Sequence, residues 1–510
     1  MRGRATCKWL VLGYAWAGLA CSPSGGGSAD AGATADVALA RDAAIPDGRS
    51  PLEAGSVDRG TGDATRADAG PPPPFVPGEL GTSAAVLDLD GDGHLDLVVG
   101  APSSSEGARA GAVLIYRGSA SGFGSTPAAK LLGETEGDSF GARVAAVGDV
   151  DGDGKPELAV SALHATGRMP LSGAVYVYRG GQLPPTRLAK LSGEVALDRF
   201  GSSVAGGDLD GDGRSELVVA APLARGYQLY SGAVYLYRSG KALTDAADVK
   251  LGGSAQQGAI GAAALAVGDL TADGLSELLV GTGHSVLVFL GRKDLQQHLA
   301  STPEADSEIH GRPLTATGHT GSGFGNALAV AGDLDGDGVG DLVVANPSRT
   351  VPDLFTNRGC VYLFRGAKKL PTDILESDPA TRLVKLVGEA DASQFGASVA
   401  LVPDVNGGGA PDLVVGARWA AGGQGGTSPV AGKGYLFHTE ELLGKGGGEV
   451  GASSAVRTLV ADTPSGELGG TVAAGPAGSV VLGAPRLEQE KGGAFVFTLK
   501  SGQAQRLQTP

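Results

Sequence analysis

The sequence is poor in several residue types that common protein classes depend on. Only three of its 510 residues are cysteines, Cys7, Cys21 and Cys360, and the first two lie near the start of the chain. Cys360 has no partner in the body of the chain, so we expect no intramolecular disulfide. This shortage excludes the small secreted domains that disulfides hold together.

Clustered positive charge is also absent. The chain has 40 basic and 55 acidic residues, a net charge of -15, and no run of Lys and Arg of the kind that binds nucleic acid. Its 7 histidines are scattered without a metalloprotease spacing, and no Gly-x-Ser-x-Gly turn lies between an evident strand and an evident helix. We therefore predict that the protein is not an enzyme.

The N-terminus has the pattern of an export signal. A basic start precedes an apolar stretch over residues 9–20, which is too short to cross a bilayer core of about 30 Å. The residues up to Cys21 resemble the end of a bacterial lipoprotein signal, in which the cysteine is lipidated, although Gly18 stands where such signals usually have leucine. We expect a signal peptide over residues 1–21 with lipidation at Cys21. Ordinary secretion is the alternative.

Residues 22–79 are rich in Ala, Gly and Asp and include four successive prolines at 71–74. The segment has no sustained apolar period, so it cannot bury enough surface to offset the entropy lost on ordering. We expect a disordered linker. Together with the signal, it predicts an exported protein, lipid-anchored at a bacterial outer membrane or cell surface, or otherwise secreted.

Glycine is the residue in excess. The 87 glycines are more than twice the usual share of roughly 7%. A glycine inside a helix costs roughly 1 kcal/mol relative to alanine, which excludes a mostly helical protein. A hydrophobic content of 42% excludes wholesale disorder, and the lack of a Gly-x-y period excludes collagen. A large all-β protein with many tight turns remains.

One unit recurs seven times through residues 80–510. Each unit has an apolar-Gly pair, then a loop that is acidic in most copies, a short apolar run, and a run that alternates aromatic and aliphatic residues. In the second unit these are Phe140-Gly141, DVDGDG from Asp149, LAVSA from Leu158 and AVYVYRG from Ala174. With a further run, which is KLSGE from Lys190 in the second unit, each unit offers four short strands, and these predict a four-stranded antiparallel blade.

Seven such blades predict a closed seven-bladed β-propeller, which leaves no long sheet edge exposed. The blades are expected to begin near residues 80, 139, 199, 259, 323, 394 and 467. The seventh unit has its own candidate for a last strand, between Ala504 and Gln508. We expect this strand to complete the last blade. A strand from the residues before Gly81 is disfavoured by the prolines there.

The units resemble FG-GAP repeats, which form the seven-bladed propeller of integrin alpha chains and related bacterial proteins. The motifs that carry the resemblance include Phe140-Gly141, Phe200-Gly201, Gly100-Ala101-Pro102 and Gly483-Ala484-Pro485. The resemblance implies calcium in the loops between the first two strands of the blades. It also implies that partners bind the opposite face, through the connections between strands two and three and between blades.

The residues of the first loop favour a cation in their own right. Asp88, Asp90, Asp92 and Asp96 are closely spaced, and the intervening glycines tolerate positive φ and let the chain curl, so the carboxylates converge with the carbonyl of His94. Converging carboxylates repel one another, and a hard divalent cation relieves that repulsion. Calcium accepts 6–8 oxygen ligands in irregular geometry, whereas magnesium requires an octahedron. The alternative is a set of Asp-Gly turns without metal.

Four loops carry the complete set, and we predict a structural calcium ion in each. The predicted ligands are Asp88, Asp90, Asp92, the carbonyl of His94 and Asp96; Asp149, Asp151, Asp153, the carbonyl of Lys155 and Glu157; Asp208, Asp210, Asp212, the carbonyl of Arg214 and Glu216; and Asp333, Asp335, Asp337, the carbonyl of Val339 and Asp341.

The other three loops depart from this set. The fourth keeps Asp269, Asp273 and Glu277 but has lost a central carboxylate, so a fifth, weaker site there is left open. The sixth has Asp404 and Asp412 around an asparagine and a glycine, and we expect it to be empty or weak. The seventh has no acidic loop.

We predict that the protein is a calcium-binding adhesion or protein-interaction module at the cell envelope. Its function would be to recognise a protein or glycan ligand. Aromatic and arginine side chains dominate binding hot spots. The candidates in the connections on the partner face are Tyr227, Tyr230, Arg349, Arg418 and Trp419. Each of these side chains could instead fold onto its own blade. The alternative functions are a propeller-based enzyme acting on carbohydrate or lipid, and a periplasmic assembly scaffold.

Overall fold

A computed structural model describes residues 79–507, apart from 106–108, 227–229, 254–258, 302–303, 312–322, 349, 352–355, 390–392, 421–430, 445–447, 462–465 and 488–490. The chain divides into two units, Met1–Ala69 and Gly70–Pro510, and the description concerns the second. The predicted signal peptide, the linker up to residue 78 and Cys21 lie outside the described residues, as do Tyr227 and Arg349. Within the described ranges, no helix has the length and hydropathy to cross a membrane.

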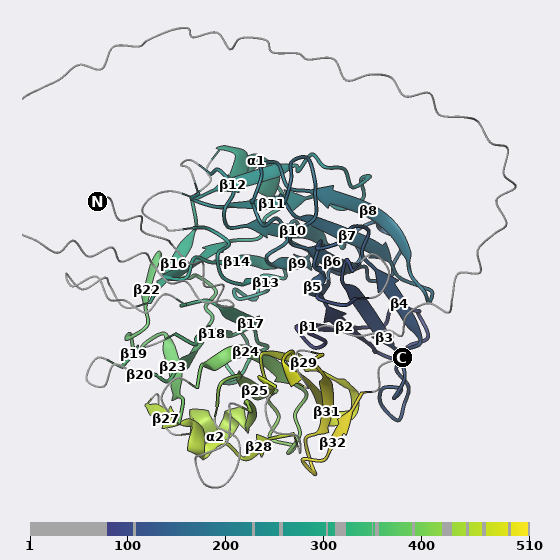
Figure 1. Ribbon diagram of the computed structural model, residues 1–510. Helices are drawn as coiled ribbons and strands as arrows, with labels where there is room; N and C mark the ends of the chain where they lie inside the picture. Colours follow the sequence, from purple (N-terminus) through teal and green to yellow (C-terminus); the bar gives the residue numbers. More distant parts are fainter. Residues whose placement is uncertain are drawn as a thin grey trace, which may run out of the picture. The chain divides into compact units, whose positions relative to one another are not determined.

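Seven antiparallel sheets follow one another along the chain and stand side by side around a common centre (Figure 1). The prediction of an all-β, seven-bladed propeller is confirmed. The strands of blades one to four are β1 Ser83–Leu87, β2 Asp96–Ala101, β3 Ala112–Tyr116 and β4 Ala129–Leu132; β5 Phe140–Ala146, β6 Leu158–Ala162, β7 Ala174–Arg179 and β8 Thr186–Ser192; β9 Val204–Gly207, β10 Glu216–Ala221, β11 Ala233–Tyr237 and β12 Val249–Gly252; β13 Leu265–Gly268, β14 Glu277–Gly281, β15 Ser285–Phe289 and β16 Ser307–His310.

The remaining three blades have the same order of strands. They are β17 Ala327–Val330, β18 Leu342–Asn346, β21 Cys360–Phe364 and β23 Arg382–Val387; β24 Phe395–Val402, β25 Asp412–Ala417, β26 Lys433–Phe437 and β28 Arg457–Leu459; and β29 Thr471–Ala474, β30 Ser479–Gly483, β31 Ala494–Thr498 and β32 Ala504–Arg506. A two-stranded hairpin, β19 Thr350–Val351 and β20 Thr356–Asn357, extends from blade five. Cys360 is buried in β21 and forms no disulfide; it is the only cysteine in the described part of the chain.

Blades four and five each gain a fifth, parallel strand, which the repeat pattern does not predict. β22, Asp373–Leu375, pairs with β16, and β27, Glu449–Gly451, pairs with β23. Each comes from the connection between the third and fourth strands of the following blade, and each covers the outer edge of its neighbour. The short helices α1, Leu295–Ser301, and α2, Thr439–Leu443, lie in the same kind of connection, and the helical turns η1, Ala452–Ser454, and η2, Pro476–Gly478, lie in blades six and seven.

Blades one and seven close the ring by packing and hydrogen bonds, without exchanging a strand. β32 pairs with β31, so the expectation that a C-terminal strand completes blade seven is confirmed. The Thr471 hydroxyl donates to the carbonyl of Thr82 at 2.7 Å, and the Gly493 amide donates to the carbonyl of Leu80 at 2.9 Å. A buried cluster that includes Leu97, Tyr116 and Val481 fills this junction.

The hydrophobic core is divided among the junctions between neighbouring blades, and one buried cluster lies at each of the seven. The repeated Phe-Gly pair belongs to these clusters. The ring of Phe140 meets that of Tyr176 edge-on at 5.3 Å. Gly141 has a φ of +90°, and a Cβ there would lie 2.4 Å from the carbonyl oxygen of Ala112 in blade one. Glycine is therefore required where blade two meets blade one.

A carboxylate at the end of blade one braces the same junction. Glu134 accepts hydrogen bonds from the Tyr176 hydroxyl at 3.0 Å and the Lys190 ammonium at 2.7 Å, and it pairs with Arg187. Blades three and six repeat the arrangement with the pairs Glu194–Tyr235 and Glu389–Tyr435. The hydrogen bond from Lys190, assisted by those from Arg187 and Tyr176, lowers the pKa of Glu134 to about 2 from an ordinary value of 4.5.

Replacing Glu134 by glutamine tests this brace. Because the folded-state pKa lies below the ordinary value, the ionised carboxylate stabilises the fold fully above pH 4.5, and its contribution disappears as the pH falls toward 2. We expect E134Q to lower the free energy of unfolding by about 1 kcal/mol at pH 7, since solvent screens the half-exposed pair. Urea unfolding of both proteins at several pH values measures the difference. A difference that does not shrink between pH 4.5 and 3 contradicts the assignment.

Candidate metal centres

The acidic loops connect the first and second strands of their blades, so they all lie on one face of the ring. We number each loop from its first aspartate. Position 1 is Asp88, Asp149, Asp208, Asp269, Asp333 or Asp404, and position 9 is Asp96, Glu157, Glu216, Glu277, Asp341 or Asp412. Position 9 begins the second strand or immediately precedes it.

The position 1 carboxylate holds the loop in its curled shape. In blade two, Asp149 accepts hydrogen bonds from the amides of Gly152 at 2.7 Å, Asp153 at 3.0 Å and Gly154 at 2.8 Å. Positive φ at both glycines turns these amides inward. The sixth loop forms the same bonds, and that from Gly409, with others from its neighbours, lowers the pKa of Asp404. The turn is therefore specified by position 1 even where the acidic set is incomplete.

The position 9 carboxylate is buried in all six loops. One of its oxygens accepts the amide of position 2, as from Val150 to Glu157 at 2.7 Å and from Leu334 to Asp341 at 2.8 Å. Burial raises the pKa of Glu157 and Glu277 to about 7 and that of Asp341 to about 6, and it raises the pKa of the other three. An ionised carboxylate here is poorly solvated, which favours binding a cation.

Positions 1, 3 and 9 meet in each of the four complete loops, with ligand atoms within 4.8 Å of one another. In the fourth loop Asp269, Asp273 and Glu277 form such a group. Two buried carboxylate oxygens in these groups, Glu157 Oε1 and Asp210 Oδ1, have no hydrogen-bond partner in the described structure. Leaving such a group unpaired is costly, and an all-oxygen donor set suits a hard cation such as calcium. The residues present therefore fit a metal ion.

In the four complete loops, the position 5 aspartates do not belong to these groups. Each accepts the amide of its own position 7 residue at 2.9 or 3.0 Å, and the pairs are Asp92 with His94, Asp153 with Lys155, Asp212 with Arg214, and Asp337 with Val339. Ligation by these aspartates and by the position 7 carbonyls stays a prediction. In the sixth loop, Asn406 donates to Glu440 of α2, and His438 Nδ1 lies 3.0 Å from Asp412.

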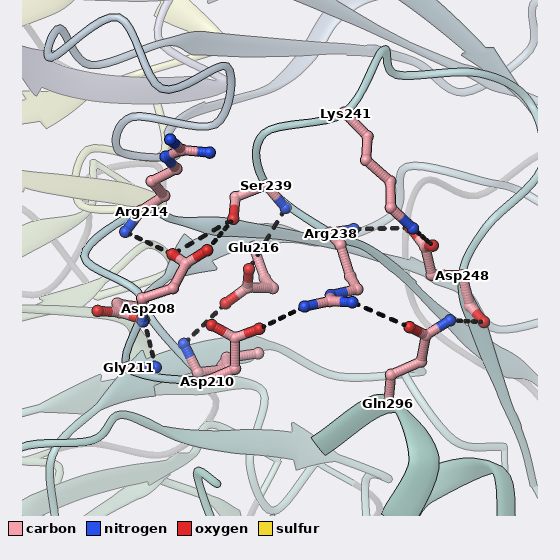
Figure 2. A network of polar contacts seen from close by, with 12 residues as sticks. Asp208, Asp210, Gly211, Arg214, Glu216, Arg238, Ser239, Lys241, Asp248 and Gln296 are labelled. Carbon is pink, nitrogen blue, oxygen red and sulfur yellow. Dashed lines mark hydrogen bonds and ion pairs between the residues drawn. The ribbon is translucent and has the colours of Figure 1, made fainter. Parts of the chain in front are cut away.

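Four arginines at these loops were missed in the sequence. Each follows the last aromatic residue of a third strand, and its guanidinium pairs with the position 3 aspartate. The pairs are Arg117–Asp90, Arg179–Asp151, Arg238–Asp210 and Arg365–Asp335. Figure 2 shows the third of them, where Arg238 reaches toward Asp210 on one side and Gln296 on the other. The repeated pair of an aromatic residue and an arginine at the end of the third strand was the signal that could have revealed them.

One serine and one histidine lie together on the opposite face. Ser139 lies in the sequence Gly-Asp-Ser-Phe-Gly, and its Oγ is 2.9 Å from His164 Nδ1. The positive φ of Ser139 is shared by the residue before the apolar-Gly pair in other blades, including Glu79 and Glu467. The next amide, that of Phe140, donates to the carbonyl of Ala110 at 2.8 Å, so it cannot stabilise an oxyanion. The pair braces its blade, as Glu467 and Arg486 do in blade seven.

The candidate partner residues have different surroundings. Tyr230 is 62% exposed. Trp419 instead donates its indole N–H to Glu467 at 3.2 Å, and the Arg418 guanidinium lies 5.0 Å from the Trp419 ring. Arg418 also donates to Gln394. These contacts hold Arg418 and Trp419 against blades six and seven.

Comparison with known families gives one match. Residues 80–116, 140–178, 200–237 and 324–364 match the family described as FG-GAP repeat. These segments belong to blades one, two, three and five, which are the blades with complete acidic loops.

Several curated proteins are similar to this chain. Integrin alpha pat-2 of Caenorhabditis briggsae is 32% identical over 245 residues, 45% of this chain and 19% of that protein. Integrin alpha-IIb of Homo sapiens is 33% identical over 213 residues, 39% of this chain and 19% of that protein. Phosphatidylinositol-glycan-specific phospholipase D of Mus musculus is 35% identical over 174 residues, which are 31% of this chain and 20% of that protein. The matches thus span about a fifth of the length of these relatives.

Among solved structures, the crystal structure of BBS1N in complex with ARL6DN, soaked with lead, matches 83% of this chain and 91% of that chain. Its TM-score is 0.41 and its sequence identity is 13%.

The aspartates at positions 1 and 5 are expected to contribute differently to stability when no metal is bound. Asp149 accepts three backbone amides, whereas Asp153 accepts the amide of Lys155 and lies near Arg179 at the surface. We expect D149A to lower the free energy of unfolding in EDTA by about 2 kcal/mol and D153A by less than 1 kcal/mol. Chemical denaturation measures both. Equal losses contradict the assignment of the turn to position 1.

Proposed function

We propose that this FG-GAP repeat protein is a recognition module whose blades are braced by calcium and which has no catalytic role of its own. The observation that carries the proposal is the set of convergent carboxylates at the loops. Each set ends on a buried position 9 side chain, and in blade two one buried oxygen of Glu157 is left without a partner. The similarity to integrin alpha chains supports protein recognition and a location outside the cell.

Calcium would be held by the carboxylates of positions 1, 3 and 9 in the four complete loops, with the group around Glu277 as a weaker fifth site. The ion supplies positive charge that offsets the mutual repulsion of these groups. The first four loops along the chain also contact the next blade, because the carbonyl of position 2 accepts an amide from the residues that follow the third strand of that blade. The bonds are Leu89 from Gly181 at 2.7 Å, Val150 from Gly240 at 3.2 Å, Leu209 from Arg292 at 2.9 Å, and Leu270 from Ala367 at 3.1 Å. A loaded loop therefore stiffens the junction between blades.

An apolar patch on the opposite face is the recognition surface that we favour. Its side chains come from neighbouring connections of blades two and three, and each is 45% to 62% exposed: Met169, Leu171, Val195, Leu197 and Tyr230. The Leu197 amide donates to the carbonyl of Leu171 at 3.1 Å, which places these two connections side by side.

Leu197 gives the strongest reason to assign a partner to the patch. It is 57% exposed and has a φ of +67°. In the preceding unit the same position, which forms the same amide bond to the neighbouring loop, is Gly137. A left-handed leucine costs about 1 kcal/mol or more, and an exposed side chain returns little of this to the fold. Arg199 and Arg225 are exposed in the same connections, so a protein segment with apolar and acidic side chains suits the surface.

The enzyme alternative has less support. Phosphatidylinositol-glycan-specific phospholipase D matches this chain over a fifth of its own length. Among the described residues, the Ser139–His164 pair is the nearest approach to a nucleophile and base that we find, and its neighbouring amide is already bonded. The lipid anchor at Cys21 stays a prediction from the sequence.

Removing calcium tests the brace. At roughly 2 mM free calcium and a Kd of roughly 0.1 mM, each occupied site adds about 1.8 kcal/mol to the free energy of unfolding. We expect the melting temperature of the full chain to fall in EDTA and to recover when calcium is restored. E157Q should reduce this response, and D404N, in the sixth loop, should leave it unchanged. An identical melting temperature in EDTA and in calcium contradicts the proposal.

Substitutions in the apolar patch test recognition. L197G relieves the left-handed strain, so its free energy of unfolding should change by less than about 1 kcal/mol. We expect L197G and Y230S each to weaken saturable binding of the labelled protein to intact cells of its source organism at least fivefold. L132S, which removes an exposed leucine from β4, is the matched control. Unchanged binding by both patch variants contradicts the assignment of this surface.

A further inference from the structure

We infer that Arg117, Arg179, Arg238 and Arg365 are counter-ions built into the four complete loops. Each neutralises the position 3 aspartate when its loop holds no cation, and each lowers the affinity of that loop for calcium. The inference rests on the calcium sites proposed above.

The contact is the same in the four blades. A guanidinium nitrogen lies 2.7 Å from Asp90, 2.5 Å from Asp151, 3.2 Å from Asp210 and 2.6 Å from Asp335, in each case from the Oδ2 atom. The strand register brings this about. The residue before each arginine pairs with the residue that follows position 9, as Tyr116 does with Leu97 and Tyr178 with Leu158. The arginine is thereby carried past the end of the strand and over the loop.

The arginine and the position 3 aspartate occur together. In the fourth unit Thr271 stands at position 3, and Leu290 stands where the others have arginine. In the sixth unit the two residues are Asn406 and His438. The seventh unit has neither the aspartate nor the arginine. If the arginine served only the strand or the blade junction, it would not be expected to disappear with the aspartate.

The arginine lies on the solvent side of the carboxylate. The four position 3 aspartate side chains are 7% to 12% exposed, and their arginine partners are 37% to 55% exposed. In blades two and five the guanidinium is also 3.7 or 3.8 Å from the position 5 aspartate. It therefore lies against the acidic group that calcium would enter, and it engages only one oxygen of position 3. In blade three the other oxygen, Asp210 Oδ1, has no hydrogen-bond partner.

Two opposite effects follow from this position. Without calcium, the guanidinium relieves repulsion among the carboxylates and keeps the loop folded. With calcium bound, the guanidinium either stays close to a divalent ion that repels it or breaks its ion pair with the position 3 aspartate. At a separation of roughly 6 Å and the dielectric constant of water, that repulsion lowers affinity about tenfold. The arginine thus narrows the difference in stability between the empty and the loaded propeller.

The test compares two quadruple variants of the full chain, with the four arginines replaced by glutamine or by lysine. Isothermal titration with calcium chloride measures affinity, and melting in EDTA measures the stability of the empty form. We expect the glutamine variant to bind calcium about tenfold more tightly than the wild type and to melt at a lower temperature in EDTA. The lysine variant retains the charge, so its affinity should stay within about threefold of the wild type.

Other results of this experiment would overturn the proposed role of the four arginines. A purely structural arginine lowers the melting temperature with and without calcium and leaves affinity unchanged, which overturns the inference. Weaker binding by the glutamine variant, which would make the arginine a positioning residue for ligation, also overturns it. Absence of calcium binding by the wild type contradicts the calcium sites themselves. If the quadruple variant does not fold, R365Q alone must show both effects at one quarter of the sites.

Discussion

The structure depends on a buried carboxylate at the root of the second strand in six of the seven blades. Its inner oxygen accepts the amide of position 2, which fixes the loop to the blade, and its burial makes the ionised form costly. Two neighbouring carboxylates lie against it in the complete loops, so charge accumulates where water is excluded. A cation, a proton or a guanidinium must offset that charge. The fold therefore requires positive charge at the acidic loops, and the four arginines supply part of that charge.

The same loops connect the blades. The core is divided into seven clusters at the junctions, and the Phe-Gly pair and the Glu134–Tyr176 brace act at one side of the ring. On the other side, the position 2 carbonyls of the first four loops accept amides from the following blade. A change in loop charge therefore acts on a junction rather than on an isolated turn. The opposite face, which carries the exposed Leu197 and Tyr230, is the one that we propose for recognition.

Periodicity accounts for how much of this could be predicted. Seven copies in phase fixed the number of blades, their strands and the closing strand β32, because each copy repeats the same alternation and the same glycines. The parallel strands β22 and β27 and the helices α1 and α2 lie in the connections between the third and fourth strands of units four to six. These connections are longer than those of the other units and are not part of the repeated pattern, so nothing in the repeat indicated them. The convergence of positions 1, 3 and 9 follows from loop spacing. The arginines come from a strand some twenty or more residues away, and only the register of that strand brings them to the loop. Likewise, the sequence indicated that Trp419 was a surface residue, but its indole N–H donates to Glu467, which belongs to a different blade.

Crystals of the full chain can be soaked in terbium, a hard cation that replaces calcium and scatters anomalously, to locate the metal sites by diffraction. We expect anomalous peaks within coordination distance of Asp96, Glu157, Glu216 and Asp341, and none at Asp412 or in blade seven. Peaks confined to exposed carboxylates elsewhere, with the four buried side chains unliganded, would contradict this expectation.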